Sequence, residues 1–422
     1  MQDLTLGIGY RGRRLRCEKS FFAGTHRSIP PEQTFERLSP LFKRAGITRI
    51  ANITGLDYVG IPVCLAQRPN GQTLSNSAGK GVTLACSRVS AAMEGIELAC
   101  AENFPEPNIY ESYSHIAAGC QCVMDLEDLP LHSASLFRTD VPELWIPAWD
   151  IVSQREVLVP YEATCFSMPK RRRAQRYSNF VRNSNGLAGG NTLLEAVTAA
   201  LYEVIERDAV AISLTLHEES IRPLARIDPE MASDPSISEM NELIRAAGLE
   251  LLVFDVSVDT TVPCFMAVLL DDDPASAPVA AGYGAHLDPT IAMSRSITEA
   301  AQGRLVTIAG SRDDIFASDL QAFHAFRRGT VKLYRSVTLR EDYQLPSSAA
   351  GSDFETDVLT LIRKLDAVGL SQVLVIEVND FLPEVPVVRV MVPGLEGLHT
   401  EPYRNRPRLK RIMDDCRDLH TS

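Results

Sequence analysis

The chain lacks both a long hydrophobic run and an excess of basic residues. Its 422 residues carry a formal net charge of -12 at pH 7, whereas nucleic-acid-binding proteins need a basic surface. No stretch reaches the roughly 18 apolar residues that a membrane-spanning helix requires. The first residues, MQDLTLGIGYRGRRLR, contain no hydrophobic targeting core. The sequence therefore predicts a cytoplasmic protein that binds neither membranes nor nucleic acids.

Cysteine and histidine patterns typical of disulfide or zinc proteins are also missing. The nine cysteines are scattered, which is typical of reduced thiols rather than of a disulfide framework. Cys120 and Cys122 form a C-x-C pair without a matching second pair, so small buried residues near a turn are favoured over a zinc site. The eight histidines form no H-x-x-x-H or H-E-x-x-H pattern, which disfavours a zinc hydrolase.

Two common ATP-binding patterns are absent as well. The sequence contains no G-x-x-x-x-G-K-[ST] loop and neither of the kinase patterns H-R-D and D-F-G. Lysine is scarce, since only seven of the 42 basic residues are lysines. A lysine in a glycine-rich stretch, such as Lys80 in SAGKG, is therefore a candidate for a chemical role, with an ordinary surface charge as the alternative.

What the chain does contain is a series of short strands that alternate with helices. Residues 72–81 and 184–191 read as glycine-rich loops. Alternating or continuous apolar residues predict two strands around a turn in 49–69 and further strands at 143–147, 156–160, 249–258, 264–272, 372–378 and 386–394. Helical periodicity predicts helices over 82–103, 192–209, 289–310 and 357–370 and one that begins near 238.

This order of elements predicts an α/β (α+β) fold with mixed sheets. We expect an N-terminal strand and loop region over 1–75, a catalytic domain over 76–400 and a C-terminal tail over 401–422. A basic run, PKRRRAQRY (169–177), is either a solvated loop or a surface that steers phosphate or an acidic peptide.

The helix after residue 191 gathers three carboxylates on one side. On a helical wheel Glu195, Glu203 and Glu206 fall within about 80° of one another, and Arg207 lies at the border of this face. Apolar residues such as Leu201 and Ile205 occupy the opposite side. The helix therefore presents an acidic face backed by an apolar stripe.

Two other helices repeat this arrangement at i, i+4 and i+7 spacing. The helix over 82–103 carries Ser90, Glu94 and Glu97, and the helix over 289–310 carries Arg295, Glu299 and Gln302. These carboxylates lack the i, i+4 lysine partners that relieve like charges on an ordinary solvated face. The alternative remains that each face is simply exposed to water.

Clustered carboxylates of this kind are stabilised by a hard divalent cation. Mg²⁺ prefers oxygen ligands, commonly carboxylates together with substrate phosphates. Glycine-rich loops and helix N-termini supply the N–H donors that hold phosphates, and Arg207, Arg295 and Lys80 could neutralise phosphate charge. The residues alone therefore indicate a Mg-ATP enzyme whose site differs from the two common types.

At these positions the sequence resembles the YcaO family. The stretch SNGLAGGNTLLEAVTAALYEVIERDA (184–209) is similar to its central ATP-binding motif, SAAMEGIE (90–97) to its earlier S-x-x-x-E-x-x-E helix and RSITEAAQ (295–302) to its later R-x-x-x-E element. The resemblance implies a YcaO-like fold and an enzyme that uses ATP to phosphorylate a backbone amide oxygen of a peptide. A nucleophile then adds to the amide carbon, and phosphate leaves.

The resemblance also assigns roles to individual residues. It implies that Arg207, Arg295 and, more weakly, Lys80 act in catalysis through phosphate. Nucleotide contacts are expected from Ser90, Ser184, Asn191, Glu195, Arg207 and Arg295, with Lys19 and Arg27 as weaker candidates. The implied Mg²⁺ ligands are Glu94, Glu97, Glu195, Glu203, Glu206 and Glu299.

The particular reaction is expected to be thioamide formation. Azoline-forming YcaO members often end in P-x-P-x-P, whereas this chain ends RLKRIMDDCRDLHTS. The segment from Gly24 to Val63 and the SAGKG stretch resemble the subgroup that works beside a TfuA-like partner. The resemblance thus implies a peptide or protein substrate, a TfuA-like partner, a sulfur donor and a homodimer. The alternatives are an azoline-forming cyclodehydratase and a non-catalytic docking protein with the same fold.

Overall fold

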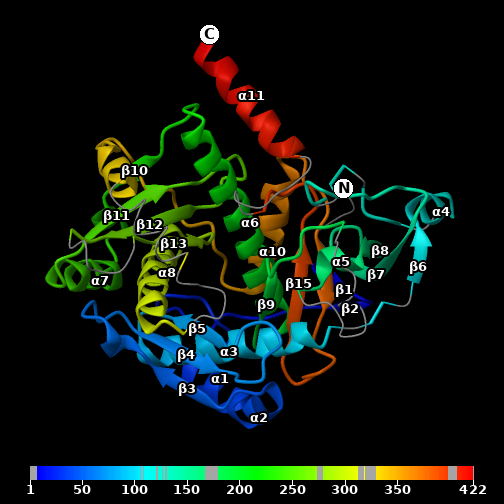
Figure 1. Cartoon of the computed structure of the whole chain (residues 1–422), viewed down its shortest axis with the longest axis horizontal. Helices are drawn as coiled ribbons and strands as arrows, with labels where there is room; N and C mark the ends of the chain where they lie inside the picture. Colours follow the sequence, from blue (N-terminus) through cyan, green and yellow to red (C-terminus); the bar gives the residue numbers. More distant parts are fainter. Residues whose placement is uncertain are drawn as a thin grey trace. The chain divides into compact units, whose positions relative to one another are not determined.

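A computed structural model describes residues 7–104, 106–107, 109–119, 122–125, 127–128, 131–166, 179–272, 279–311, 318, 329–397 and 406–421. The chain divides into two compact units (Figure 1). Unit 1 comprises residues 1–18, 99–216 and 351–422, and unit 2 comprises residues 19–98 and 217–350. The division falls within two long helices, α3 (Leu84–Glu102) and α6 (Leu193–Glu218).

Unit 2 contains two antiparallel sheets. The larger has the order β10-β11-β12-β13, and the smaller has the order β3-β4-β5. Their bounds are β10 (Ala225–Ile227), β11 (Glu250–Asp255), β12 (Cys264–Leu270), β13 (Ala280–Ala285), β3 (Arg49–Asn52), β4 (Val63–Gln67) and β5 (Asn76–Lys80). The helical elements are α1 (Pro31–Leu38), η2 (Ser39–Leu41), α2 (Phe42–Ala45), η3 (Thr54–Leu56), η5 (Pro229–Ala232), α7 (Pro235–Ala246) and α8 (Pro289–Ala309).

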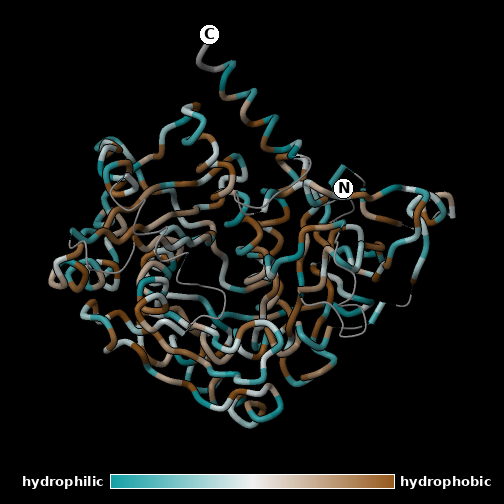
Figure 2. Tube along the Cα trace, in the orientation of Figure 1, coloured by the Kyte–Doolittle hydropathy of each residue, from teal (hydrophilic) through white to brown (hydrophobic). Residues whose placement is uncertain are grey.

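Helix α8 is the central helix of unit 2. Asp288 caps its N-terminus by accepting hydrogen bonds from the backbone N–H groups of Thr290 and Ile291. The helix packs against β12 and β13 and also against β4 and β5 (Figure 1). Every residue of β12 is buried, and Figure 2 shows this strand as hydrophobic. The apolar side of α8 is thus covered by sheet, which fixes the direction of its polar face.

Unit 1 is built on a six-stranded sheet. Its order is β6-β7-β14-β15-β9, with β8 paired to β7, and a two-stranded sheet joins β1 and β2. The strands are β1 (Gly9–Tyr10), β2 (Arg13–Arg14), β6 (Ile109–Ser112), β7 (Pro142–Asp150), β8 (Arg155–Pro160), β9 (Leu187–Gly189), β14 (Leu374–Glu377) and β15 (Val387–Met391). Besides the long helices, the helices here are α4 (Tyr113–Ala118), α5 (Tyr161–Thr164), α10 (Phe354–Asp366) and α11 (Pro407–Thr421).

The predicted fold class is confirmed, and most predicted elements are present. The prediction of mixed sheets was wrong in one respect, because every pairing between the named strands of the described part of the chain is antiparallel. This is the α+β form of the predicted class. The three helices with acidic faces are α3, α6 and α8. The predicted C-terminal tail contains α11, which Figure 2 shows with alternating hydrophilic and hydrophobic segments.

Two predictions of glycine-rich loops were wrong. Within 72–81, residues Asn76–Lys80 form β5 and pair with β4, and within 184–191, residues Leu187–Gly189 form β9 and pair with β15. Tertiary pairing overrides the low strand propensity of glycine at these places. At Gly79 the glycine is required, because a methyl group there would overlap the backbone of Ser87 and Ala91 on α3.

Gly282 sets the distance between β13 and α8 in the same way. A methyl group at Gly282 would overlap the backbone of Ser296 and Ala300. We expect Gly282→Ala to force the strand and helix apart and to cost about 2 kcal/mol of stability. The measurement is urea denaturation followed by far-UV circular dichroism.

A matched control is available on α8 itself. Gly303 is exposed, and a methyl group there would meet only the Ala281 carbonyl at 3.7 Å, an ordinary contact. Gly303→Ala should therefore be neutral or stabilise by up to about 1 kcal/mol through better helix propensity. A Gly282→Ala protein as stable as the wild type would show that the strand and helix tolerate a wider spacing.

Candidate nucleotide and metal site

The acidic face of α6 in unit 1 is buried rather than exposed to water. The side chains of Glu195 and Glu206 belong to residues that are each only 3% exposed, and Glu203 and Arg207 are partly buried. The apolar residues predicted on the opposite side, including Leu201 and Ile205, are also buried. Because a buried carboxylate is costly without a compensating positive charge, this burial disfavours the alternative that the face is merely solvated.

The N-terminus of α6 positions Glu195. The amide nitrogen of Asn191 lies 3.1 and 3.3 Å from the two carboxylate oxygens of Glu195 and donates to them. The Thr192 hydroxyl accepts a hydrogen bond of 3.2 Å from the Glu195 backbone N–H, which makes it the helix cap. Ser184 lies just before β9, where its carbonyl accepts from the backbone of Leu187. The predicted residues Asn191 and Glu195 are thus in direct contact.

Near Glu206, α6 carries charges on two different sides. One Arg207 guanidinium nitrogen lies 3.9 Å from the Glu206 carboxylate. The next residue, Asp208, is fully buried and accepts two hydrogen bonds of 2.9 Å from Arg408 at the start of α11. Asp208 also accepts from the backbone N–H of Glu396 at 2.8 Å. Sequence reasoning missed Asp208 because its partner lies 200 residues away.

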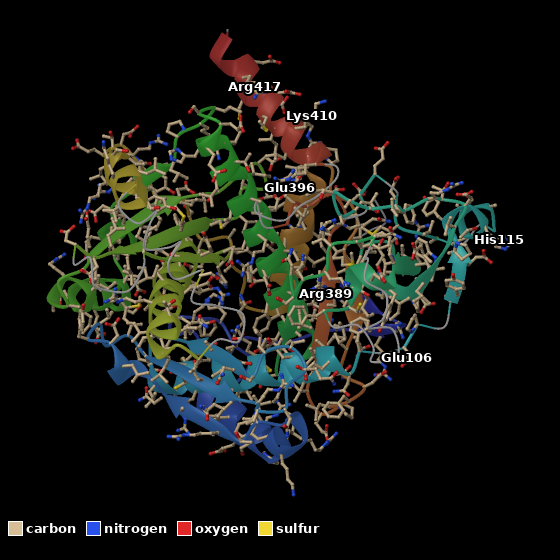
Figure 3. The ribbon with its side chains drawn as sticks, viewed as in Figure 1. Glu106, His115, Arg389, Glu396, Lys410 and Arg417 are labelled. Atoms are coloured by element: carbon tan, nitrogen blue, oxygen red, sulfur yellow. The ribbon has the colours of Figure 1, made fainter. Side chains whose placement is uncertain are left out.

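The first part of α11 is held to the same region. The Glu396 carboxylate accepts hydrogen bonds from the Leu409 backbone N–H at 3.1 Å and from Arg406 at 2.7 Å. Figure 3 shows Glu396 below the helix that carries Lys410 and Arg417. The C-terminal helix is therefore anchored within unit 1 beside the segment that contains Glu206 and Arg207.

In unit 2, α8 and β5 bring predicted residues together. The Lys80 ammonium forms an ion pair with the Glu299 carboxylate. One turn further along α8, the Gln302 amide donates a hydrogen bond of 2.5 Å to the backbone carbonyl of Ala78 on β5. Glu94, Glu97 and Ser90 are partly buried on α3. The geometry of unit 2 thus places Lys80 on Glu299, a contact that the sequence did not predict.

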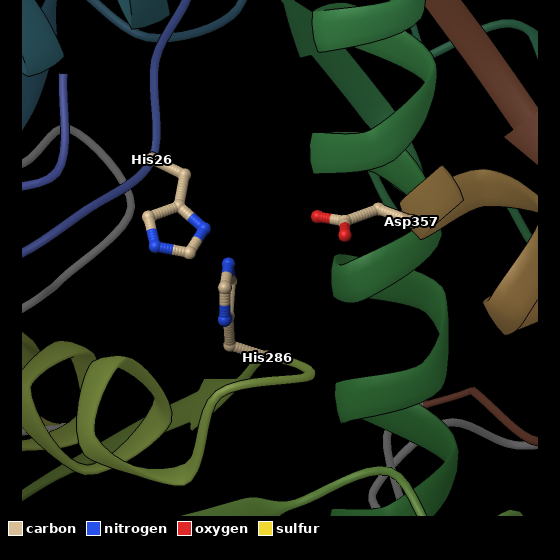
Figure 4. A group of neighbouring side chains, drawn as sticks. All are labelled: His26, His286 and Asp357. Atoms are coloured by element: carbon tan, nitrogen blue, oxygen red, sulfur yellow. The ribbon is translucent and has the colours of Figure 1, made fainter. Parts of the chain in front are cut away.

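A second group in unit 2 combines cations with two histidines. The rings of His26 and His286 meet edge to face with centroids 5.0 Å apart (Figure 4). Burial, followed by the charge of Lys19, lowers the pKa of His26 to about 4, with Asp288 opposing. Burial also lowers the pKa of His286, and His26, Arg295, Lys19 and Arg27 act in the same direction. Both imidazoles are therefore neutral at pH 7.

This group has the properties of an anion site. Lys19 is only 7% exposed, and the Nε atom of Arg295 is buried without a hydrogen-bond partner. A buried lysine and a buried guanidinium nitrogen without a partner favour a bound anion such as phosphate. The sequence predicted Lys19, Arg27 and Arg295 as phosphate contacts but missed both histidines, since no fixed spacing connects residues 26 and 286.

The donor atoms also fit the cofactors that the sequence predicted. Glutamate oxygens on α6 of unit 1, and on α3 and α8 of unit 2, are the hard ligands that Mg²⁺ prefers. The cations of unit 2 suit phosphate oxygens. Cys165 is buried, and burial raises the pKa of its thiol to about 12, so it is a packing residue rather than a reactive thiolate. The basic run at 169–177 and Cys120 lie outside the described residues.

Comparison with known proteins identifies the family. Residues 78–396 match the model of the YcaO cyclodehydratase family, which binds ATP and Mg²⁺. An uncharacterised protein in the tfuA 3′ region of Rhizobium leguminosarum bv. trifolii is 34% identical over 378 residues, which cover 88% of each chain. The chain therefore belongs to the YcaO family, and the predicted cofactors, ATP and Mg²⁺, are confirmed.

Solved structures confirm the predicted fold. The YcaO protein of Methanopyrus kandleri bound with AMPPCP and Mg²⁺ superimposes with a TM-score of 0.68 at 21% identity, covering 93% of this chain and 98% of that one. A heterocyclase in complex with substrate and cofactor gives a TM-score of 0.74 at 23% identity. The match covers 96% of this chain but spans only 57% of the heterocyclase.

In the part of the chain that the structure describes, no helix is both long and apolar enough to cross a bilayer.

Proposed function

We propose that this protein uses Mg-ATP to phosphorylate the oxygen of a peptide backbone amide and that the activated carbon is converted to a thioamide. The amide oxygen attacks the γ-phosphorus, and ADP leaves. Sulfide then adds to the amide carbon, and phosphate departs with the original amide oxygen. Phosphorylation turns a poor leaving group into a good one, and this explains why the reaction needs ATP.

The observation that carries this proposal is the burial of Glu195 and Glu206 on α6. Two nearly inaccessible carboxylates on one helix face require positive charge, and oxygen ligands favour Mg²⁺ over a transition metal. We assign Glu94, Glu97, Glu203 and Glu299 to metal binding as well. Asn191 orients Glu195, and Ser90 and Ser184 are assigned to the nucleotide.

The cationic residues are assigned to the phosphates. Arg207 borders the buried carboxylates of unit 1, whereas Lys19, Arg27 and Arg295 form the cationic group of unit 2. Such preorganised charges stabilise the transferring phosphoryl group. The predicted division into 1–75, 76–400 and 401–422, with the middle part catalytic, stays a proposal.

One finding supports thioamidation over other products. The relative from Rhizobium leguminosarum is named for the tfuA 3′ region, and the match covers 88% of its length. We propose a TfuA-like partner that helps deliver sulfur, a sulfur donor in solution and a homodimeric enzyme. The peptide substrate is bound either directly or through the partner.

An azoline-forming cyclodehydratase is the second candidate, because the matched family is named for that reaction and a structural neighbour is a heterocyclase. Its nucleophile is a Cys, Ser or Thr side chain of the peptide, so it needs no sulfide. A docking protein without catalysis is a weaker candidate, since all six predicted metal-ligand glutamates are present.

One assay separates these functions. The protein is incubated with candidate peptides, Mg-ATP and sulfide, with and without a TfuA-like partner, and the peptides are analysed by mass spectrometry. We expect replacement of one oxygen by sulfur that depends on ATP and on sulfide. Loss of one water without sulfide would instead identify a cyclodehydratase. An unmodified peptide under every condition, with no ATP consumed, would support the docking protein.

A further inference from the structure

Lys80 and Glu299 form a partly buried ion pair between β5 and α8. Their side chains are 18% and 22% exposed, respectively. The Gln302–Ala78 hydrogen bond joins the same two elements one helical turn away. Because β5 also pairs along its length with β4, the backbone of Lys80 is held in place. Its side chain extends from this strand to Glu299.

The identity of this cation is informative. Only seven of the 42 basic residues are lysines, and an arginine would bind a carboxylate in a planar, two-pronged geometry. An ammonium is a compact point charge on a flexible stem, so it resembles a metal ion in charge density and can move away. Lys80 therefore has the properties of a replaceable cation rather than of a permanent clamp.

We propose that the Lys80 ammonium is a tethered cation that neutralises Glu299 until Mg²⁺ binds, and that Mg²⁺ must displace it. This inference rests on the proposed function, in which Glu299 is a metal ligand. In the metal-free protein the ammonium offsets the negative charge of this partly buried carboxylate. Once displaced, the Lys80 ammonium can meet a phosphate oxygen beside α8, which carries Arg295 one turn before Glu299.

The direct test is calorimetric titration of Mg²⁺ into the nucleotide-free protein. Lys80→Met removes the competing cation, so we expect its Kd for Mg²⁺ to fall by about tenfold relative to wild type. Lys80→Gln should give the same gain and covers the case in which the methionine variant does not fold. Lys80→Arg keeps the charge and should bind Mg²⁺ no more tightly than wild type.

Two controls assign the effect to this pair. In a Glu299→Gln background, Lys80→Met should produce no gain, because the carboxylate for which the two cations compete is gone. Lys43→Met removes one exposed lysine on α2 and should leave the titration unchanged. An unchanged or weaker Mg²⁺ affinity in both neutral Lys80 variants would overturn the inference, and so would an absence of Mg²⁺ uptake in every variant.

A separate measurement distinguishes failure of this inference from failure of the proposed function. Wild-type protein is titrated with AMPPCP in the presence and absence of Mg²⁺. If the wild type binds AMPPCP in a Mg²⁺-dependent way and Lys80→Met has an unaltered Mg²⁺ affinity, then Mg²⁺ does not displace Lys80 from Glu299. The proposed function is not contradicted by that result. Absence of AMPPCP binding by the wild type contradicts the proposed function, whatever the Lys80 variants do.

Discussion

Replacing Glu206 by glutamine should abolish Mg²⁺-dependent ATP binding. Glutamine has nearly the same volume as glutamate and removes only the charge, and Glu206 is 3% exposed on a face that also contains Glu195 and Glu203. A neutral amide is a poor ligand for a hard divalent cation. We expect ATP affinity in the presence of Mg²⁺ to fall by about 100-fold or more, since even indirect supporting residues at metal sites contribute 10- to 100-fold. Calorimetry with and without Mg²⁺ measures this loss.

The same variant should fold as well as the wild type. Removing one carboxylate from a buried acidic face relieves repulsion in the metal-free protein, so thermal stability should stay the same or rise. Glu218→Gln, an exposed change in the last turn of α6, is the matched control and should bind ATP normally. Unchanged Mg²⁺-dependent ATP binding in Glu206→Gln would remove the main support for a metal site on this helix.

The sequence predicted the acidic helices because they depend on local periodicity. The helices expected over 82–103 and 289–310 correspond to α3 and α8 within a residue or two. On α6, the 100° spacing correctly separated the carboxylates from the apolar residues. Burial of Glu195 and Glu206 could not be predicted, because polar faces are usually solvated and only tertiary packing decides which are covered.

Long-range pairings explain what the sequence did not reveal. Strands β5 and β9 are rich in small or polar residues, and they are strands only because β4 and β15 offer them hydrogen-bond partners. His26 and His286 are brought together by the fold of unit 2. The ion pair of Lys80 with Glu299 likewise joins residues 219 positions apart. Local sequence patterns cannot predict these contacts, because each joins residues that are far apart in the chain.

The second large effect is expected at the ion pair of Asp208 on α6 with Arg408 on α11. Arg408→Met leaves the fully buried Asp208 carboxylate without its guanidinium partner. Breaking a buried ion pair from one side costs about 3–5 kcal/mol. The only two tryptophans of the chain, Trp145 and Trp149, lie on β7 in unit 1. Urea denaturation followed by tryptophan fluorescence therefore reports the stability of this unit directly.

The pH dependence of the stability of Arg408→Met tests whether the unpaired Asp208 carboxylate causes the loss of stability. Burial raises the pKa of Asp208, and Arg408 opposes this rise, so the pKa in the folded variant should climb further above its unfolded value. A carboxyl group whose pKa is higher in the folded than in the unfolded protein favours the folded state when it is protonated. This stabilisation is fully present below the pKa of the unfolded state and is lost as the pH rises through the pKa of the folded state. The stability deficit of Arg408→Met should therefore be largest at pH 7 and shrink at pH 5.

The double variant Asp208→Asn/Arg408→Met separates this electrostatic effect from lost packing. Asparagine is neutral, and its side-chain oxygen can still accept the hydrogen bond from the Glu396 backbone N–H. If the unpaired charge dominates, the double variant recovers most of the stability at pH 7 and loses the pH dependence. If the double variant is as unstable as Arg408→Met at both pH values, the arginine acts through its packing in the first turn of α11. Restored stability with weakened Mg-ATP binding would further show that this anchor positions the adjacent Glu206 and Arg207.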